Sequence, residues 1–401
     1  MTVNLSNRAR NASPSATLAI AAVAKQMKAD GIDVVDFGLG EPDFETPDHV
    51  KEAAIVAIRE GFTRYTAASG IDELKKAIVT KLKRDNGLSY NPAEVIVSCG
   101  SKHSLFNIAE VLFESGDEVI VPAPYWVTYT EQIQLVDARP VIVQTREEDG
   151  FHLTRAAVEP AITPKTKAIL LNSPCNPTGA MIPPEQLRAI AALAVERDLL
   201  VISDEAYESM TYSGHTHMSI ASLGEEVKQR TILVNTVSKA YAMTGWRIGY
   251  AAGPADIIKA MGTIQSQVTS NPTSIAQKAA VAALLGPQND LCTMVIEFDR
   301  RRRYLLSRLH TIPGITCTNP EGAFYLFPNV SSFYGAVVNG VPIRNSAEMA
   351  AHLLQTANVV SVPGSEFGSD AHLRLSYATS MDNIRKGAER IERALGALRK
   401  G

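Results

Sequence analysis

Short apolar runs recur in the middle of the chain, at residues 95–99, 118–122, 140–144, 168–172, 199–203, 231–235 and 248–252. They are rich in β-branched residues, and most lack strict polar alternation, so they predict strands covered on both faces. Helical patterns such as 103–113 and 184–198 separate several of these runs. This alternation predicts an α/β fold with a largely parallel, seven-stranded sheet between layers of helices.

A helix is predicted to begin at Thr46-Pro47, because proline suits the first helical position. Its apolar residues fall on one helical face, which comprises Val50, Ala53, Ala54, Ala57 and Ile58.

The pattern changes after Gly286-Pro287. A long charged helix ends in four arginines at 300–303, and apolar stretches at 322–328 and 373–378 predict short strands before a final helix. We therefore expect residues 1–47 to join a small domain, 48–287 to form a large domain, and 288–401 to form the small α+β domain. The basic run at 300–303 predicts a solvated helix face rather than a nucleic-acid contact.

Composition narrows the class of protein. The chain has 401 residues, is 45% hydrophobic and 20% charged, and carries a net charge of −3. That charge provides no electrostatic basis for binding nucleic acid or an anionic membrane. The apolar run after Arg8 and Arg10 is too short and Ala-rich to favour a targeting segment, and no run approaches the roughly 20 residues of a membrane span. The scattered cysteines favour reduced thiols in a cytoplasmic protein over disulfides or a zinc site.

Chemistry-bearing residues follow the predicted strands, where an open parallel sheet binds its ligands. Gly100-Ser101-Lys102 opens a helix, and this turn either presents backbone N–H groups to an anion or only closes a corner. Trp126 is either a core residue or a stacking plate for a flat ring. Asn176 lies among turn residues and is equally explained as one of them.

A carboxylate, an amine and a guanidinium follow two later runs. Asp204 comes directly after a buried strand, where it is either a helix N-cap or the partner of a cation. Tyr207 lies nearby, and Lys239 and Arg247 are the only charges in residues 235–250. Pyridoxal phosphate needs a lysine for its Schiff base, an acid at its ring nitrogen and donors for its phosphate. Together the groups at this edge predict a site for that cofactor, with Lys239 as the amine and Arg247 on the phosphate.

The sequence resembles the class I aspartate aminotransferases of fold type I, in the bacterial branch typified by thermophile and rhizobial enzymes. The resemblance covers nearly the whole chain and is carried by GEPDFETPDHV, PYWVTY, NSPCNPTG, SDEAYE, SKAYAMTGWRIGYAAGP and LRLSYATS. It implies that Lys239 forms the Schiff base and shuttles the proton, and that Asp204 pairs with the ring nitrogen. It also implies that Tyr207 and Asn176 bond the phenolic oxygen of the ring, while Trp126 stacks on it.

The same resemblance assigns the phosphate and substrate ends. Around the phosphate it implies Gly100, Ser101, Lys102, Thr236, Ser238 and Arg247, with Tyr65 reaching the site of a neighbouring subunit. For the substrate α-carboxylate it implies Gly40, Trp126, Asn176 and Arg374. Gly40 is also explained by a tight turn, and Arg374 by a surface ion pair.

The chain departs from one branch of the family at residues 265–272, QSQVTSNP, where an arginine that grips the distal carboxylate is absent. The bacterial branch uses a lysine and a PSAT segment instead, and Lys102, Ser15 and Thr17 match them. Relatives that accept prephenate often carry a basic residue before PSAT, where this chain has Ser13.

We therefore expect a cytoplasmic homodimer with shared active sites that transfers an amino group from L-aspartate to 2-oxoglutarate, giving oxaloacetate and L-glutamate. Its partners would be small amino and keto acids, without nucleic acid, membrane or metal. Alternatives with the same cofactor are another amino donor (aromatic, alanine, kynurenine or prephenate/glutamate) or a β-lyase. The intact Lys239 disfavours a non-catalytic regulator.

Overall fold

A computed structural model describes residues 3–14, 16–338 and 340–398. The larger body is built on a seven-stranded sheet in the order β2-β8-β7-β6-β5-β3-β4. These strands span Val95–Ser98 (β2), Glu118–Ala123 (β3), Arg139–Gln144 (β4), Thr166–Asn172 (β5), Leu200–Asp204 (β6), Thr231–Thr236 (β7) and Gly249–Ala252 (β8). Within the sheet β3 to β7 run parallel, while β8 is antiparallel to both β2 and β7. The predicted mostly parallel sheet is confirmed, and β8 is its exception.

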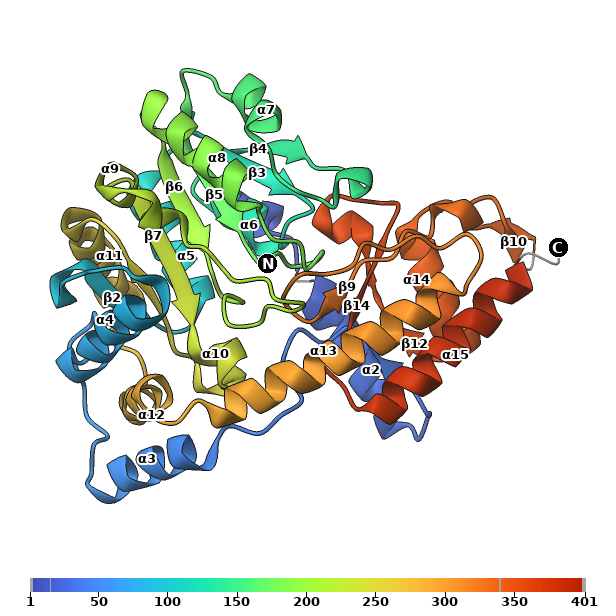
Figure 1. Cartoon of the computed structure of the whole chain (residues 1–401), viewed down its shortest axis with the longest axis horizontal. Helices are drawn as coiled ribbons and strands as arrows, with labels where there is room; N and C mark the ends of the chain where they lie inside the picture. Colours follow the sequence, from blue (N-terminus) through green and yellow to red (C-terminus); the bar gives the residue numbers. More distant parts are fainter. Residues whose placement is uncertain (1–2, 15, 339, 399–401) are drawn as a thin grey trace.

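Helices cover both faces of this sheet (Figure 1). Those of the larger body are α3 (Asp48–Arg59), α4 (Asp72–Asn86), α5 (Ser101–Leu112), α6 (Thr128–Leu135), α7 (Arg155–Val158), α8 (Pro184–Glu196), α9 (Glu225–Lys228), α10 (Val237–Ala240), α11 (Ala255–Val268) and α12 (Ser274–Leu285). The strands lie between two layers of side chains. In β5, for example, Ala168 to Leu171 are all buried, and each fully buried aliphatic side chain favours folding by ~1.5–3 kcal/mol.

A smaller lobe contains the C-terminal end of the chain's described part together with α2 from its N-terminal part (Figure 1). Its elements are α2 (Ala16–Ala29), β1 (Val35–Asp36), β9 (Tyr325–Leu326), β10 (Val337–Val338), β11 (Val341–Pro342), α14 (Ser346–Ala357), β12 (Val359–Val360), β13 (Val362–Pro363), β14 (Leu373–Ser376) and α15 (Met381–Leu398), and the short α1 (Asn7–Asn11) precedes them. The N-terminal segment enters this lobe because β1 pairs in parallel with β12. The division of the chain at residues 47 and 287 stays a prediction.

The helix α13 (Asn289–His310) runs from the larger body into the smaller lobe (Figure 1). It is longer than predicted, since it continues past the arginines at 300–303. The prediction that these arginines form a solvated face is wrong for two of them. Arg301 bonds Asp43, and Arg302 bonds Asp299, and both arginines are buried. Nearby carboxylates compensate these buried charges, which the sequence pattern of the helix alone does not reveal.

The start of α3 also differs from the prediction. Pro47 lies just before the helix, which begins at Asp48. Val50, Ala54 and Ala57 are buried as expected, but Ile58 is 52% exposed. The apolar stripe of α3 is therefore wider than the face it packs with.

No single helix in the described part of the chain is long and apolar enough to cross a membrane; α12 and α13 pass that test only together, across a 77° bend. The four cysteines are free, as expected.

Candidate active site

A cavity of about 450 Å³ opens at the edge of the sheet where the parallel strands end. Its walls come from both lobes and from segments far apart in sequence. They comprise Gly38, Leu39, Gly40, Glu41, Ser101, Lys102, Trp126, Tyr129, Asn172, Asn176, Asp204, Ala206, Tyr207, Thr236, Ser238, Lys239, Thr244, Arg247, Tyr325 and Arg374. Most of the residues predicted for the site are therefore brought together in one cavity.

The helix α5 begins at this cavity and forms one side of an anion cradle. Gly100 precedes the helix with φ +88°, a conformation that glycine adopts without strain. A Cβ there would lie 2.4 Å from Arg247 Nη2, so a side chain at position 100 would displace the guanidinium. The unpaired N–H groups of the first helical turn and Arg247 together favour an anion at this place.

Arg247 reaches the cradle because β8 is antiparallel. Thr236, the last residue of β7, pairs with Gly249, the first of β8, so the start of β8 lies at the edge where β7 ends. Arg247 has φ +56° and donates to the backbone oxygens of Thr244 (2.8 Å) and Cys99 (3.3 Å). The guanidinium is thus aimed at the helix terminus by two carbonyl groups.

Lys239 lies on the short turn α10 beside this cradle. Thr236 caps the turn by accepting a hydrogen bond from Ser238 N at 3.1 Å. The Lys239 ammonium donates to the Gly40 carbonyl oxygen. Burial lowers the pKa of Lys239 to about 8, although Glu41 opposes the shift. Near neutral pH a usable fraction of this amine is therefore unprotonated, as a nucleophile requires.

Asp204 ends β6 and is 3% exposed. The alternative of a helix N-cap is wrong, because turns rather than a helix follow it. Its Oδ2 accepts from the Tyr129 hydroxyl at 2.7 Å, and its Oδ1 accepts from Ala206 N at 3.2 Å. Burial raises the pKa of Asp204 to about 6, against the lowering effect of these two bonds. The positive charge of Lys239 lowers this pKa only partly, so a cationic ligand atom beside the buried carboxylate would be favoured.

Arg374, on β14 of the smaller lobe, is 2% exposed, so the alternative of a surface ion pair is wrong. It donates to Asn176 Oδ1 (3.0 Å) and to the Gly38 carbonyl oxygen (2.8 Å), and its guanidinium lies 4.5 Å from the Tyr325 ring centroid. Within the described residues, its Nε has no hydrogen-bond partner. Burial lowers the pKa of Arg374. A buried cation held only by neutral groups favours an incoming carboxylate.

Trp126 and Lys102 form the outer rim of the cavity. The Trp126 ring is half-buried and meets Tyr129 edge to face, so it serves both packing and the cavity wall. The Lys102 ammonium lies 4.9 Å from the Trp126 ring centroid. Partial burial, together with the positive charge of Arg247, lowers the pKa of Lys102.

Among the described residues, Tyr65 and Gly100 were predicted for the site but do not line the cavity. Tyr65 is 90% exposed on the surface. Ser15 lies outside the described residues, as does the side chain of Thr17, whose backbone belongs to α2. Gly100 contributes indirectly, because the absence of a side chain there leaves room for the Arg247 guanidinium.

The sequence interpretation missed five polar lining residues, which are Glu41, Tyr129, Asn172, Thr244 and Tyr325. Tyr129 could have been predicted from the sequence, because it lies three residues after Trp126 in PYWVTY, about one helical turn further on. Tyr325 shares a hydroxyl–hydroxyl hydrogen bond of 2.8 Å with Tyr207, across 118 positions in sequence. No local pattern signals such a contact.

Residues 32–391 match the family described as Aminotransferase class I and II. The aspartate aminotransferase of Geobacillus stearothermophilus is 49% identical over 98% of this chain and 100% of that protein. An aspartate/prephenate aminotransferase of Nitrosomonas europaea is 46% identical over 97% of this chain and 99% of its own length. Among solved structures, the aspartate aminotransferase of Thermus thermophilus with maleate aligns with a TM-score of 0.93 at 43% identity, covering 98% and 100% of the two chains.

Proposed function

The chain belongs to the class I and II aminotransferases, and from this premise we propose that it transfers the amino group of L-aspartate to 2-oxoglutarate with pyridoxal phosphate as cofactor. The observation that carries the proposal is the convergence of Lys239, Asp204 and Arg374 on one cavity. They supply an amine, a buried acid and a carboxylate receptor, and they come from three separate parts of the chain. The named relatives match over nearly the full length of both chains, which supports aspartate as the donor.

The residues present fit this cofactor. The side-chain-free Gly100 and the guanidinium of Arg247 leave an anion cradle for the phosphate, with Ser101, Thr236 and Ser238 as further donors. Asp204 would hold the ring nitrogen, Tyr207 and Asn176 the phenolic oxygen, and Trp126 the ring face. When bound, the cofactor supplies an aldehyde that links to an amine and a ring that withdraws electrons from it.

The chain's own groups perform the remaining tasks. Lys239 provides the amine that holds the cofactor and, once released by the substrate amine, removes the proton from the substrate α-carbon. With the cofactor bound, the negative charge of Asp204 would favour a proton on the ring nitrogen. Arg374, supported by Asn176, orients the α-carboxylate so that the α-carbon faces Lys239.

Lys102 is our candidate for the distal carboxylate of the substrate. It lines the cavity, and its partly buried ammonium gains from an anionic partner. We propose that Ser15 and Thr17 add hydroxyl donors. The presence of maleate, a dicarboxylate, with the Thermus relative supports this assignment.

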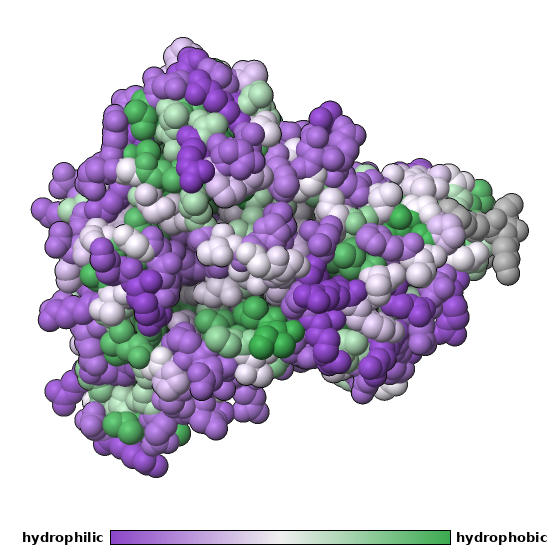
Figure 2. Space-filling view, viewed as in Figure 1, coloured by the Kyte–Doolittle hydropathy of each residue, from purple (hydrophilic) through white to green (hydrophobic). Residues whose placement is uncertain are grey.

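We also propose a homodimer in which Tyr65 completes the partner's site. Apolar side chains exposed near this residue support a protein interface: Ile55 is 39%, Val56 40% and Ile58 52% exposed on α3. Leu285 and Ile296, at the end of α12 and on α13, are 50% and 72% exposed. Figure 2 shows a hydrophobic area on an otherwise largely hydrophilic face, near the position of α10 and the start of α13 in Figure 1. Patches of this kind favour association. The free thiols support our proposal of a cytoplasmic location.

The decisive experiment measures kcat/KM for a panel of amino donors with 2-oxoglutarate as acceptor. We expect aspartate to exceed alanine, phenylalanine and kynurenine. Glutamate with prephenate is tested in parallel, because one relative carries that activity in its name. A panel in which a neutral donor outperforms aspartate would overturn the proposal.

A further inference from the structure

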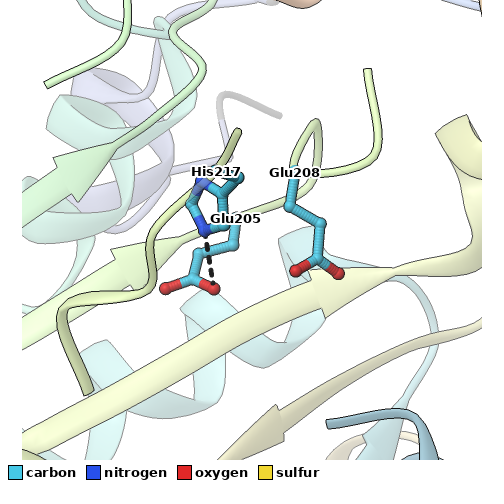
Figure 3. Close-up of side chains that lie close together, drawn as sticks. All are labelled: Glu205, Glu208 and His217. Atoms are coloured by element: carbon cyan, nitrogen blue, oxygen red, sulfur yellow. Dashed lines mark ion pairs between the residues drawn. The ribbon is translucent and has the colours of Figure 1, made fainter. Parts of the chain in front are cut away.

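A second cluster of charged side chains lies behind the cavity and is not part of the proposed chemistry. Glu205, Glu208 and His217 converge so that their ligand-type atoms lie within 4.8 Å of one another (Figure 3). Glu205 and Glu208 flank Tyr207 on the segment after β6. Two carboxylates and an imidazole could in principle hold a metal ion.

The chain itself already supplies the balancing charges. The Lys81 ammonium, from α4, donates to Glu208, and His217 Nε2 lies 3.1 Å from Glu205 Oε2. Burial opposes protonation of His217, but the negative charge of Glu205 prevails and raises the pKa of His217. Burial likewise works against ionised Glu208, but Lys81 and His217 lower its pKa. Lys81 and His217 therefore already give the two carboxylates partners from the chain itself.

One branch of this cluster leads to Lys239. Asn235 Nδ2 donates to Glu208 Oε1 at 2.6 Å, and Asn235 Oδ1 accepts from Thr236 N at 2.7 Å. Thr236 in turn caps the turn α10 that bears Lys239. A chain of hydrogen bonds thus runs from the Lys81–Glu208 pair to Thr236, the residue that caps the turn bearing Lys239.

A second branch stays within the pair, because Asn86 Oδ1 accepts a hydrogen bond from the Lys81 ammonium at 2.9 Å. Asn86 Nδ2, at the end of α4, donates to Glu208 Oε2, also at 2.6 Å. The two asparagines therefore make matched bonds to the two oxygens of one carboxylate. Only Asn235 passes the contact on toward Lys239.

We propose that Glu208, acting through Asn235, is a positioning residue that holds the Lys239 turn in the buried end of the cavity. The inference deepens the proposed function and rests on it. The Lys81–Glu208 pair fixes the Asn235 amide, which holds the Thr236 N–H at the start of α10. Buried hydrogen bonds to a charged group are the strong kind, and they suit this anchoring role.

The state of the Lys239 amine reports on this anchor. Its surroundings are Glu41 and Asp204, which favour the charged form, and Arg247 and Arg374, which oppose it, while burial has the largest effect and lowers its pKa to about 8. If the turn loosens, the amine gains water and its pKa moves up toward the ordinary lysine value. At pH 7 a rise of one unit leaves about one tenth as much free amine.

The test uses the cofactor-free full-length chain and does not rely on turnover. Pyridoxal phosphate is added between pH 6 and 10, the bond it forms is reduced with sodium borohydride, and peptide mass spectrometry quantifies labelling of Lys239. For Asn235→Ala we expect the pH midpoint of labelling to rise by about one unit and the rate at pH 7 to fall about tenfold. For the matched control Asn86→Ala we expect a midpoint within 0.2 units of the unsubstituted protein, about the precision of such a titration.

A second variant guards against poor folding of Asn235→Ala. The double change Lys81→Met, Glu208→Met removes both charges together, so neither is left unpaired, yet it releases Asn235. It should shift the midpoint as Asn235→Ala does. The positioning role would be overturned if the pH midpoint shifted equally in Asn235→Ala and Asn86→Ala. It would also be overturned if the midpoint shifted neither in Asn235→Ala nor in the double variant. Absence of Lys239 labelling in the unsubstituted protein would instead refute the proposed function.

Discussion

Asp204 and Arg374, at the inner end of the cavity, are 3% and 2% exposed, whereas Lys102 at its outer rim is more open to solvent. Each inner group is held by at least two hydrogen bonds from the chain itself. At the rim, Lys102 rests over an aromatic ring and is pushed toward the neutral form by burial and by Arg247. The inner end is thus organised before any ligand arrives, while the rim presents the Lys102 ammonium, which a ligand anion would stabilise.

This difference assigns different tasks to the two ends. Groups that carry the chemistry must be fixed, so their removal should abolish activity with every substrate. Groups at the rim recognise one part of one class of substrate, so their removal should be selective.

Lys239→Ala should lower kcat with aspartate by about 10⁴-fold, because it removes both the amine that holds the cofactor and the general base. The expected loss is the same for every amino donor. The measurement is single-turnover kinetics with the visible spectrum of the bound cofactor as a second signal. Retention of a pH-dependent visible band together with aspartate turnover would contradict the assignment of Lys239.

Asp204→Asn should lower kcat by about 10³-fold, since breaking a buried charge pair typically costs 3–5 kcal/mol. The cofactor should still bind through the cradle. Near-normal turnover in a variant that retains its cofactor would show that catalysis does not need the Asp204 carboxylate.

The same substitution should stabilise the cofactor-free protein, because burial destabilises the ionised carboxyl of Asp204 in the folded chain. Its pKa is raised to about 6 in the folded chain from 3.8 when unfolded. Below pH 3.8 the carboxyl is protonated in both states and has no effect; between 3.8 and 6 its destabilising effect grows, and above pH 6 it is complete. Asn at position 204 should therefore add about 3 kcal/mol of unfolding free energy at pH 8 and little at pH 4. Urea unfolding at both values measures this, and an equal gain at the two would contradict it.

Lys102→Ala should lower kcat/KM for aspartate by roughly 2–4 kcal/mol, or about 30- to 1000-fold, as expected when one partner of a desolvated charge pair is removed. Phenylalanine presents no distal charge, so its kcat/KM should stay within about twofold. The two donors are measured side by side on one preparation. If both values fall by the same factor, Lys102 serves the cofactor phosphate, and its assignment to the distal carboxylate of the substrate is wrong.

The contrast between the two ends also explains what could be predicted from the sequence. Strand runs and the residues that follow them are local patterns, so the carboxyl edge, Asp204 and Lys239 were predictable. The antiparallel direction of β8 was not, because a strand's apolar pattern reads the same in both directions. Arg301 and Arg302 were wrongly predicted to be solvated, because their partners Asp43 and Asn319 lie outside the helix that carries the two arginines. Arg374 could be assigned only through family resemblance.

Tyr129 provides the smallest and sharpest test of the inner end, because its hydroxyl bonds directly to Asp204. It comes from α6, and its hydroxyl donates to Asp204 Oδ2 at 2.7 Å, which lowers the pKa of that carboxyl against the effect of burial. Tyr129→Phe keeps the ring that packs edge to face with Trp126 and removes only this donor. A hydrogen bond to a charged group contributes about 1.5 kcal/mol or more, so kcat/KM should fall about tenfold where Asp204 must be ionised.

Because loss of the bond raises the pKa of Asp204 above about 6, the acidic limb of the pH profile should move to higher pH. The deficit in kcat/KM should therefore be largest near pH 6.5 and shrink by pH 8.5. The loss should be the same for aspartate and phenylalanine, unlike that of Lys102→Ala. A uniform loss at all pH values would mean that Tyr129 acts by packing alone, and a loss confined to aspartate would erase the distinction between the buried end and the rim.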